Sequence, residues 1–278
     1  GIPQCQELFG VTPRELNARL TPLEIATCGM LIFGRFAAPD AIGTLEQYLG
    51  DGYPILQALC NRNTAPYSMS RIVEANWKLC LHVSLDDYHI VAVHPSTFGK
   101  TGYLSRNRIG YFRFGRHNAF LNATDDPDAL KKMAAACRDG TYMPPTYRIL
   151  QFFPNFAANH TRIVDRWFMT LHLYIPLAVN RTLWQFWFYP AAFPIEDRGW
   201  WRNLRYYMTA IGLPIGVRYF GGRVADEDKD VCEKLQSIAH QVDGSPILGL
   251  EEERIAWFED AYAETMRPAP AVAQPGFA

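Results

Sequence analysis

The chain has 278 residues, of which 49% are hydrophobic and 20% are charged, and its formal net charge is −1 with a pI near 6.7. This composition is typical of a globular protein and excludes an intrinsically disordered chain. A net charge near zero argues against nucleic acid or an anionic membrane surface as the main partner. The sequence contains no run of 18 uncharged apolar residues, so it predicts no transmembrane helix, and no secretory signal is visible. Six scattered cysteines are typical of reduced thiols, and we therefore expect a cytoplasmic protein.

The predicted elements mix strands and helices along the chain. In chain order, we expect strand character over 23–36, a short helix over 55–62, a long helix over 71–94, strand-like alternation over 103–123, a helix over 125–137, strands over 146–153, 163–175 and 182–189, and helices over 200–211 and 226–241. Antiparallel strands followed by helices favour an α+β fold, with one sheet and the helices on one side. The Pro/Ala-rich residues 267–278 predict a disordered tail.

Two sets of side chains in the later part of the chain have more than one interpretation. Aromatic residues along the predicted strands favour a buried core over a substrate cage, and they are Trp167, Phe168, Trp184, Phe186, Trp187 and Phe188. A group of arginines among aromatics predicts solvated strand-edge residues, with a docking surface for an acidic redox partner as the alternative, and it comprises Arg106, Arg108, Arg113 and Arg116.

The long predicted helix carries the pattern D-x-Y-H-x4-H, from Asp86 through His89 to His94. Asp86 and His89 are three residues apart and share a helix face. His94 lies about 140° further round an ideal helix than His89, so both imidazoles reach one metal only if the helix is distorted, as by a π-bulge, or ends between them. Pro95 favours a helix that ends at His94. Two histidines and a carboxylate suit a non-heme Fe(II) site, and the alternative is a half-buried helix with two unrelated histidines.

This pattern and the preceding Glu74-Ala75-Asn76-Trp77-Lys78-Leu79 resemble the iron-binding segment of Rieske-type aromatic-ring-hydroxylating oxygenases, in their large catalytic subunit. The resemblance implies that His89 and His94 bind mononuclear iron. It also implies that Asp86 orients His89 and bridges towards the Rieske cluster of a neighbouring subunit.

A downstream acidic segment, residues 224–236, resembles the E-D-x-x-x-C-E-x-x-Q pattern of the same family. The alignment selects Asp228 as the third iron ligand, while Asp226, Glu227 and Asp230 are near enough to compete with it. Taken alone, such a run is typical of a solvated helix N-terminus.

The resemblance extends over roughly residues 20–240, since Leu45-Glu46-Gln47-Tyr48-Leu49-Gly50 is similar to the segment that leads into the family's catalytic domain. It implies a helix-grip, START-like fold, in which a curved antiparallel sheet packs around a long helix. The whole of residues 1–266 would then be one mononuclear iron catalytic domain.

The sequence departs from the family in two places. It contains no C-x-H or C-x-x-H, the motifs that supply the ligands of a Rieske [2Fe–2S] cluster. The chain is therefore either a fragment or a Rieske-less subunit, similar to the one in certain purine N-demethylase systems. In the second departure, His82 stands where the family usually has an Asn near the active site.

The resemblance implies an O2-dependent oxygenase that hydroxylates or oxidatively demethylates a small aromatic or heteroaromatic substrate. Electrons would come from NAD(P)H through a reductase and a Rieske cluster on a partner chain or a missing domain, within a homotrimer or hetero-oligomer. Two alternatives stay open from the residues alone: a zinc-dependent hydrolase, although no general-base Glu follows His89, and a non-catalytic START-like ligand-binding module.

Overall fold

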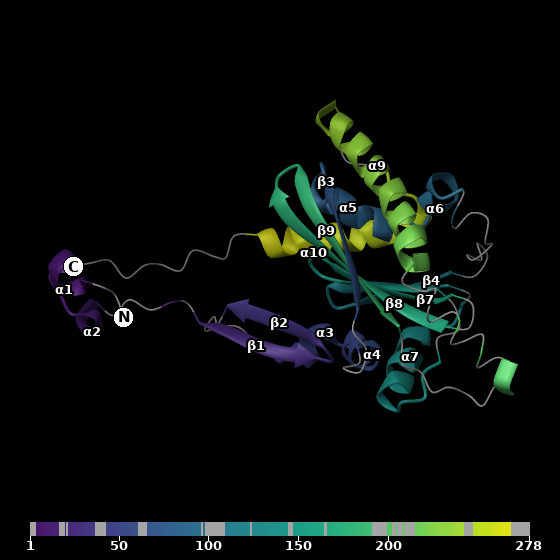
Figure 1. Cartoon of the computed structure of the whole chain (residues 1–278), viewed down its shortest axis with the longest axis horizontal. Helices are drawn as coiled ribbons and strands as arrows, with labels where there is room; N and C mark the ends of the chain where they lie inside the picture. The colour runs from purple at the N-terminus through teal and green to yellow at the C-terminus, as the bar shows by residue number, and fades with distance from the viewer. Residues whose placement is uncertain are drawn as a thin grey trace.

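The structure is a computed structural model of the chain, and it describes residues 4–16, 20, 22–36, 43–60, 66–95, 97, 109–122, 124–143, 147–163, 166–190, 199–201, 204, 208, 215–241 and 247–267. A seven-stranded antiparallel sheet forms the body of the molecule, in the order β3-β9-β8-β7-β6-β5-β4 (Figure 1). Its strands are β3 (Tyr67–Val73), β4 (Ile109–Phe114), β5 (His117–Asn122), β6 (Arg148–Phe152), β7 (Phe156–Ile163), β8 (Arg166–Ala178) and β9 (Arg181–Pro190).

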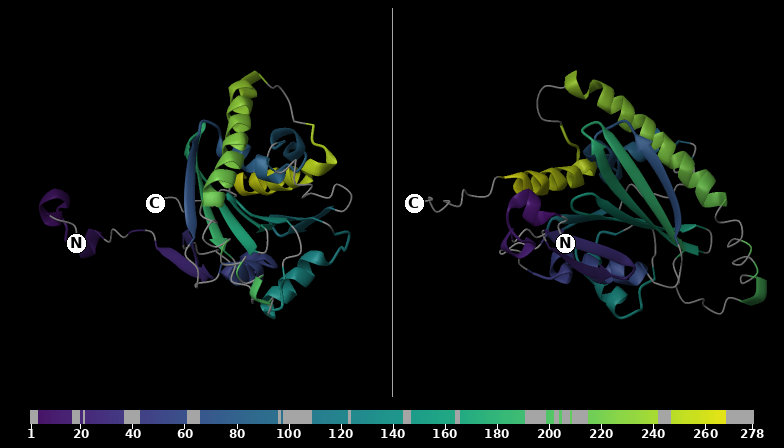
Figure 2. Two further views of the ribbon diagram at one scale, coloured as in Figure 1. Left: turned by 45° about the vertical axis from the view of Figure 1, so that its right-hand side comes forward. Right: turned by 60° about the vertical axis from the view of Figure 1, so that its left-hand side comes forward.

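Helices cover both faces of this sheet (Figure 2). One face carries α5 (Trp77–Leu85), α6 (His89–Val93), α9 (Gly222–Ile238) and α10 (Glu253–Met266), with the π-helical turn η2 (Val217–Gly221) and the 3-10 turns η3 (Ala239–Gln241) and η4 (Leu250–Glu252). The other face carries α3 (Leu45–Leu49), α4 (Gly52–Leu59) and α7 (Ala129–Arg138). The predicted α+β class is confirmed, but helices lie on both sides of the sheet instead of one.

Alternation of side chains along each strand produces two separate cores. On β8, Tyr174 points into the core under α5 and α9, where it packs with Trp184 across the strand pair. Met169 and Leu171 point the other way, into the core under α4 and α7. Trp184 and Phe186 are buried, which agrees with the predicted core role of the aromatic stripe, while the side chains of Trp167 and Phe168 lie outside the description.

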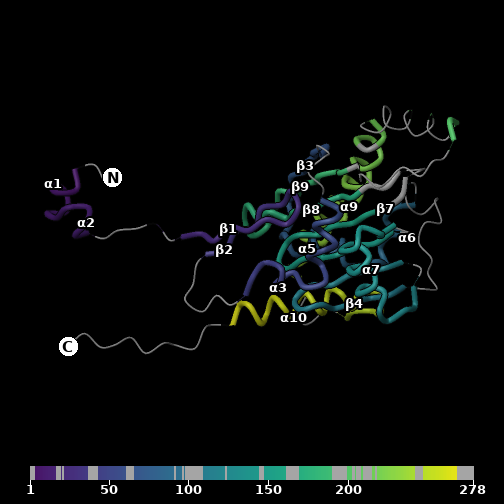
Figure 3. The backbone as a smooth tube through the Cα atoms, turned by 90° about the horizontal axis from the view of Figure 1, so that it is seen from below, coloured from purple at the N-terminus to yellow at the C-terminus, as the bar shows by residue number. Residues whose placement is uncertain are grey.

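A separate hairpin of β1 (Leu23–Cys28) and β2 (Leu31–Phe36) precedes the main sheet, and α1 (Cys5–Phe9) and α2 (Pro13–Leu16) lie beyond it (Figure 1). At the other end of the chain, α10 packs against β4 and β5 (Figure 3). Arg113 and Arg116 form half-exposed ion pairs with α10, at 3.8 Å from Asp260 and 3.7 Å from Glu264. Arg106 and Arg108 lie outside the described residues.

The predicted long helix over 71–94 is wrong. Residues 71–73 end β3 and α5 begins after Asn76. The helical conformation is then interrupted at Asp86, before α6 starts. Asn76 caps α5 by accepting a hydrogen bond from the Lys78 N–H (2.9 Å). The Asp86 carboxylate accepts the N–H groups of Tyr88 (2.7 Å) and His89 (3.2 Å), and such local bonds compete with continuation of a helix.

Other elements differ from the prediction in smaller ways. The hairpin β4–β5 replaces one alternating stretch, and α7 begins at Ala129, three residues after the Asp126 that accepts a bond from the Asp128 N–H. Strands β3 and β7 and helix α10 were not predicted. Most of the predicted helix over 200–211, the segment 103–108 and the predicted tail from 268 lie outside the described residues.

All six cysteines are buried and carry free thiols, as expected of reduced cysteines. Within the described part of the chain, no helix combines the length and the apolar character that spanning a bilayer needs.

Candidate metal centre

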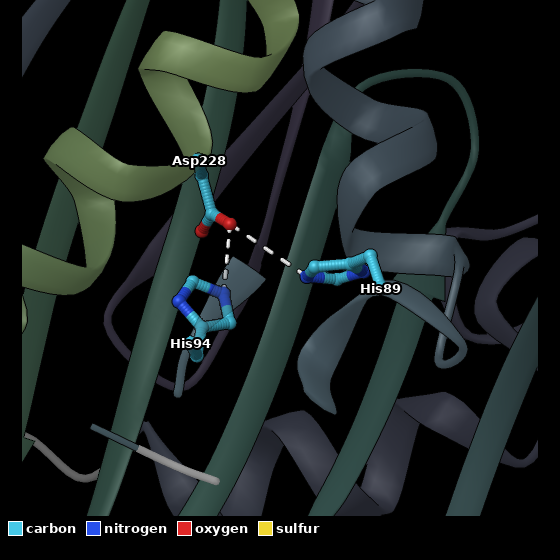
Figure 4. Close-up of side chains that lie close together, drawn as sticks. All are labelled: His89, His94 and Asp228. Atoms are coloured by element: carbon cyan, nitrogen blue, oxygen red, sulfur yellow. Dashed lines mark ion pairs between the residues drawn. The ribbon is translucent and has the colours of Figure 1, made fainter. Parts of the chain in front are cut away.

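Three side chains from two segments converge between α6 and α9 (Figure 4). His89 begins α6, His94 follows its last residue, and Asp228 faces them from α9. Asp228 Oδ1 lies 2.9 Å from His94 Nε2 and 3.6 Å from His89 Nε2. Among the described residues this is the one group of three or more His, Cys, Asp or Glu whose ligand atoms all lie within 4.8 Å of one another.

The two histidines meet because α6 is short and ends at His94. The backbone of His94 leaves the helix, with φ −111° and ψ 45°, while its N–H still donates to the Ile90 carbonyl (3.2 Å). The end of the helix therefore brings the second imidazole round towards the first, as Pro95 indicated. A π-helical turn does occur, but at η2 before α9 and not between the histidines.

His89 is oriented by the backbone of Asp86. Its Nδ1 lies 2.5 Å from the Asp86 carbonyl oxygen, whereas the Asp86 carboxylate is 3.6 Å away. A bond from Nδ1–H to a carbonyl leaves the lone pair of a neutral imidazole on Nε2, the atom that faces Asp228. The sequence suggested that the Asp86 carboxylate orients this ring; the shorter contact is with its carbonyl instead.

His94 is held by Glu227, which the sequence offered only as a competing ligand. His94 Nδ1 lies 2.7 Å from Glu227 Oε2, and Thr97 Oγ1 donates to the same oxygen (3.1 Å). Burial alone lowers the pKa of His94, but the hydrogen bonds and charges of Asp228 and Glu227 outweigh it and raise the pKa above its ordinary value. The raised pKa favours a proton on this imidazole when no ion is bound, and a binding ion must displace that proton.

The donor set fits a divalent metal ion. When Nδ1–H of His94 donates to Glu227, the lone pair on Nε2 points at a carboxylate oxygen 2.9 Å away, and these two groups repel unless a proton or a cation lies between them. Two ligands about 2.1 Å from one ion are about 3 Å apart at a 90° angle and about 3.6 Å apart at 120°. Both separations match the distances from Asp228 Oδ1 to the two histidines.

Two other acidic residues of α9, Asp226 and Asp230, point away from the histidines. Asp226 is exposed and pairs with Arg71 on β3, at 2.6 Å. Asp230 is also exposed, while Asp228 is 8% exposed and turned towards the histidines. The helical period thus separates the candidates, because residues two apart lie on opposite sides of α9.

His82 faces α10 and not the three converging side chains. Its Nε2 lies 3.0 Å from Glu259 Oε1, and its ring packs edge-on against Phe258. The same carboxylate accepts bonds from Lys78 Nζ (3.1 Å), so Glu259 joins α10 to α5. At this position, where the family usually has an Asn near the active site, the side chain of this protein packs two helices together.

The structure contains a pocket of about 650 Å³. It lies along the edge strand β3, and its lining consists of Tyr67, Ser68, Met69, Ser70, Arg71, Phe188 and Arg218. None of the three converging side chains lines this pocket.

Comparison with known structures places this fold among Rieske oxygenases. The chain is similar to a quaternary ammonium Rieske monooxygenase, CntA (TM-score 0.61, 15% identity, covering 94% of this chain and 66% of that one). It is also similar to dicamba monooxygenase bound to dicamba (TM-score 0.53, 12% identity, 88% and 71%) and to NdmA of Pseudomonas putida CBB5 (TM-score 0.52, 11% identity, 91% and 66%). The chain thus spans about two thirds of the length of these structures.

No curated protein matches the chain in sequence. A family model does: the ring hydroxylating alpha subunit (catalytic domain) matches residues 59–268. This match contains both histidines and Asp228, and it covers all seven strands of the main sheet and all the helices on the face that carries them. The chain therefore belongs to the family of ring hydroxylating alpha subunits and corresponds to their catalytic domain.

Proposed function

We propose that this chain is the catalytic part of an O2-dependent oxygenase that hydroxylates or oxidatively demethylates a small aromatic or heteroaromatic substrate. The observation that carries the proposal is the convergence of His89, His94 and Asp228 in a chain of the ring hydroxylating family. Fe(II) held by two imidazoles and one carboxylate keeps coordination positions open, and it would supply the O2 chemistry there.

The chain's own residues would prepare the site in three ways. The Asp86 carbonyl and the Glu227 carboxylate would each hold an Nδ1–H, so that both histidines present Nε2 inward. Asp228 would supply the negative charge that balances part of the charge of the ion. Burial of His94 and Asp228 would exclude bulk water from that side of the site.

Electrons would reach this site from outside the chain. The sequence has no motif for a Rieske cluster, so we propose that a partner chain or a further domain supplies the [2Fe–2S] cluster, fed from NAD(P)H by a reductase. Asp86 is a suitable bridge, because its side chain is partly exposed and adjoins His89. A homotrimer or hetero-oligomer would bring such a cluster to it. We propose one catalytic domain over residues 1–266.

Metal analysis of anaerobically purified protein tests this function. We expect about one iron per chain in the wild type and its loss in His89→Ala and His94→Ala. The Asp226→Ala variant is the matched control, since it changes an exposed carboxylate on the same helix. Zinc in place of iron, with hydrolytic activity, would indicate a zinc hydrolase. A chain that binds no metal but does bind small apolar ligands would indicate a binding module.

A further inference from the structure

Arg254 is a fully buried cation at the start of α10. Its Nε donates to Asn118 Oδ1 (2.9 Å), and the Asn118 amide donates in turn to Gln151 Oε1 (2.9 Å). These bonds hold the guanidinium against strands β5 and β6 of the sheet. Its Nη1 reaches Asp87 Oδ2 at 3.5 Å. Arg254 therefore joins three elements that the chain places far apart: α10, the sheet and the junction of α5 and α6.

Asp87 lies at the point where α5 gives way to α6, and its side chain is also buried. Its nitrogen shares a peptide bond with the Asp86 carbonyl, the group that lies 2.5 Å from His89 Nδ1. The same nitrogen is 3.5 Å from the Glu251 carbonyl in η4, the turn that leads into α10. The peptide unit that orients His89 is thus attached to the α10 segment through the Asp87 side chain and through its backbone.

The burial of this ion pair is not explained by stability alone. A buried pair contributes little net stability compared with apolar side chains of similar volume, because both charges lose their hydration. Removal of one partner, in contrast, leaves an uncompensated buried charge. Within the described residues, Arg254 Nη2 has no hydrogen-bond partner, and the Asp87 carboxylate interacts with Arg254 and with the Tyr111 hydroxyl, so the two charges depend on each other and on polar groups of the sheet.

We propose that Arg254 is a positioning residue for His89. By fixing Asp87, it holds the Asp86–Asp87 peptide so that its carbonyl keeps the His89 imidazole turned with Nε2 towards Asp228. The inference rests on the proposed function, because it takes His89 as a metal ligand.

Removal of this support should weaken metal binding in a protein that is still folded. In Arg254→Met the peptide can rotate away from His89 Nδ1, and the imidazole loses its orientation. Partners behind a ligating histidine typically change metal affinity by about 10- to 100-fold, and we expect a decrease in that range. Asp87→Asn keeps the shape of the side chain and removes its charge, and it should produce a smaller decrease in the same direction.

The test is anaerobic titration of the full chain with Co(II), followed by visible absorption, which depends on the coordination geometry. Glu259→Gln is the matched control: Glu259 also joins α10 to α5, through Lys78 and His82, but it does not touch the Asp86–Asp87 peptide. We expect this control to lower the melting temperature while leaving Co(II) affinity and spectrum unchanged. Arg254→Met should change both affinity and spectrum, and Asp87→Asn decides the question if Arg254→Met does not fold.

Two failures are distinguishable. If the wild type binds Co(II), His89→Ala abolishes binding, and the folded Arg254→Met or Asp87→Asn protein binds with wild-type affinity and spectrum, the positioning role is overturned and the proposed function stands. Equal losses in Arg254→Met and Glu259→Gln would also overturn it, because they would reflect the general docking of α10. If His89→Ala binds Co(II) as the wild type does, the ligand assignment fails, and the positioning role fails with it.

Discussion

At the scale of single residues, Asp228 and Asp226 lead to opposite expectations although they are neighbours on α9. Asp228→Ala should lose bound iron and activity while the fold survives, because it removes one of the three converging side chains that we propose as iron ligands. The decrease in affinity should exceed the roughly 10- to 100-fold effect of residues behind a ligand. Asp226→Ala should retain iron and lose only an exposed pair with Arg71. Iron content and circular dichroism of both variants measure this, and full iron in Asp228→Ala with loss in Asp226→Ala or Glu227→Ala would contradict the assignment.

The burial of His160 predicts how the stability of the folded protein depends on pH. It is 1% exposed on β7, its Nε2 lies 2.7 Å from the Tyr142 hydroxyl, and burial lowers its pKa from 6.5 to about 3. The unfolded chain therefore binds the proton more readily, so the stabilisation by neutral His160 is complete above pH 6.5 and is lost as the pH falls towards 3. As the pH falls from 6.5 to 4.5, this one group should lower the free energy of unfolding by about 2 kcal/mol.

Urea unfolding at several pH values measures this cost. His160→Gln keeps an acceptor for the Tyr142 hydroxyl but has no proton to bind in this range, so its stability should fall less steeply below pH 6.5. The substitution should be compared at each pH with the wild type, because it also has an effect on stability that does not depend on pH. Parallel stability curves for the two proteins would show that His160 is not responsible for the acid sensitivity.

At the scale of elements, the break between α5 and α6 decides whether His89 and His94 can converge with Asp228. The Asp86 carboxylate accepts the first N–H groups of α6, and its loss in Asp86→Ala should cost about 1 kcal/mol, as for other N-terminal caps. Asp86→Asn still offers an acceptor oxygen, so it should keep most of the stability and the iron. If Asp86 also bridges to the electron donor, Asp86→Asn should nevertheless turn over far more slowly. Single-turnover experiments with a pre-reduced Rieske partner separate the two effects, and normal electron transfer in Asp86→Asn would limit Asp86 to capping.

The sequence predicted the parts of the site that depend on local spacing. His89 and His94 were identified because their pattern lies within ten residues, and Asp228 because the family pattern selects it within an acidic run. The break at Asp86 was missed, since an uninterrupted apolar pattern continues across it and only the side-chain bonds to the backbone end α5. Arg254 was missed because its partner Asp87 is 167 positions away, and no local pattern marks a buried ion pair. Strand β7 was missed for a related reason. It carries the polar residues Asn159 and His160 at half-buried and buried positions, so its sequence lacks the alternation of apolar and polar residues that predicts a strand.

At the scale of the whole molecule, both faces of the sheet combine an apolar core with buried polar side chains. His117, Arg148 and His160 are buried with the core under α4 and α7, whereas Asn118, Gln151 and Arg254 are buried on the other face. The metal centre lies on the second face, between α6 and α9. The sheet thus acts as a rigid base for the helices that carry the converging side chains.

The isolated chain should be unable to sustain turnover. Because it has no motif for a [2Fe–2S] cluster, it should show no visible cluster absorption and no steady-state activity with NAD(P)H and a reductase that lacks a Rieske domain. Addition of a Rieske-bearing partner should restore turnover, since this oxygenation needs two electrons from outside the substrate in each cycle. Absorption spectra and substrate-dependent NAD(P)H consumption measure both arms. Multiple turnovers by the purified chain with a simple flavin reductase would show that no Rieske partner is required.

The separation of the converging residues along the chain has a consequence for how the protein responds to iron. His94 and Glu227 are 133 positions apart, and Asp228 follows directly. An ion bound there closes a loop of that size, so it acts as a reversible cross-link between the N-terminal and C-terminal halves of the chain. Because only the native state assembles all three ligands, iron at 100 times its dissociation constant would add about 2.7 kcal/mol to stability. Chelation would release the α9 segment first, and proteases should then cleave near α9 faster while the sheet stays intact.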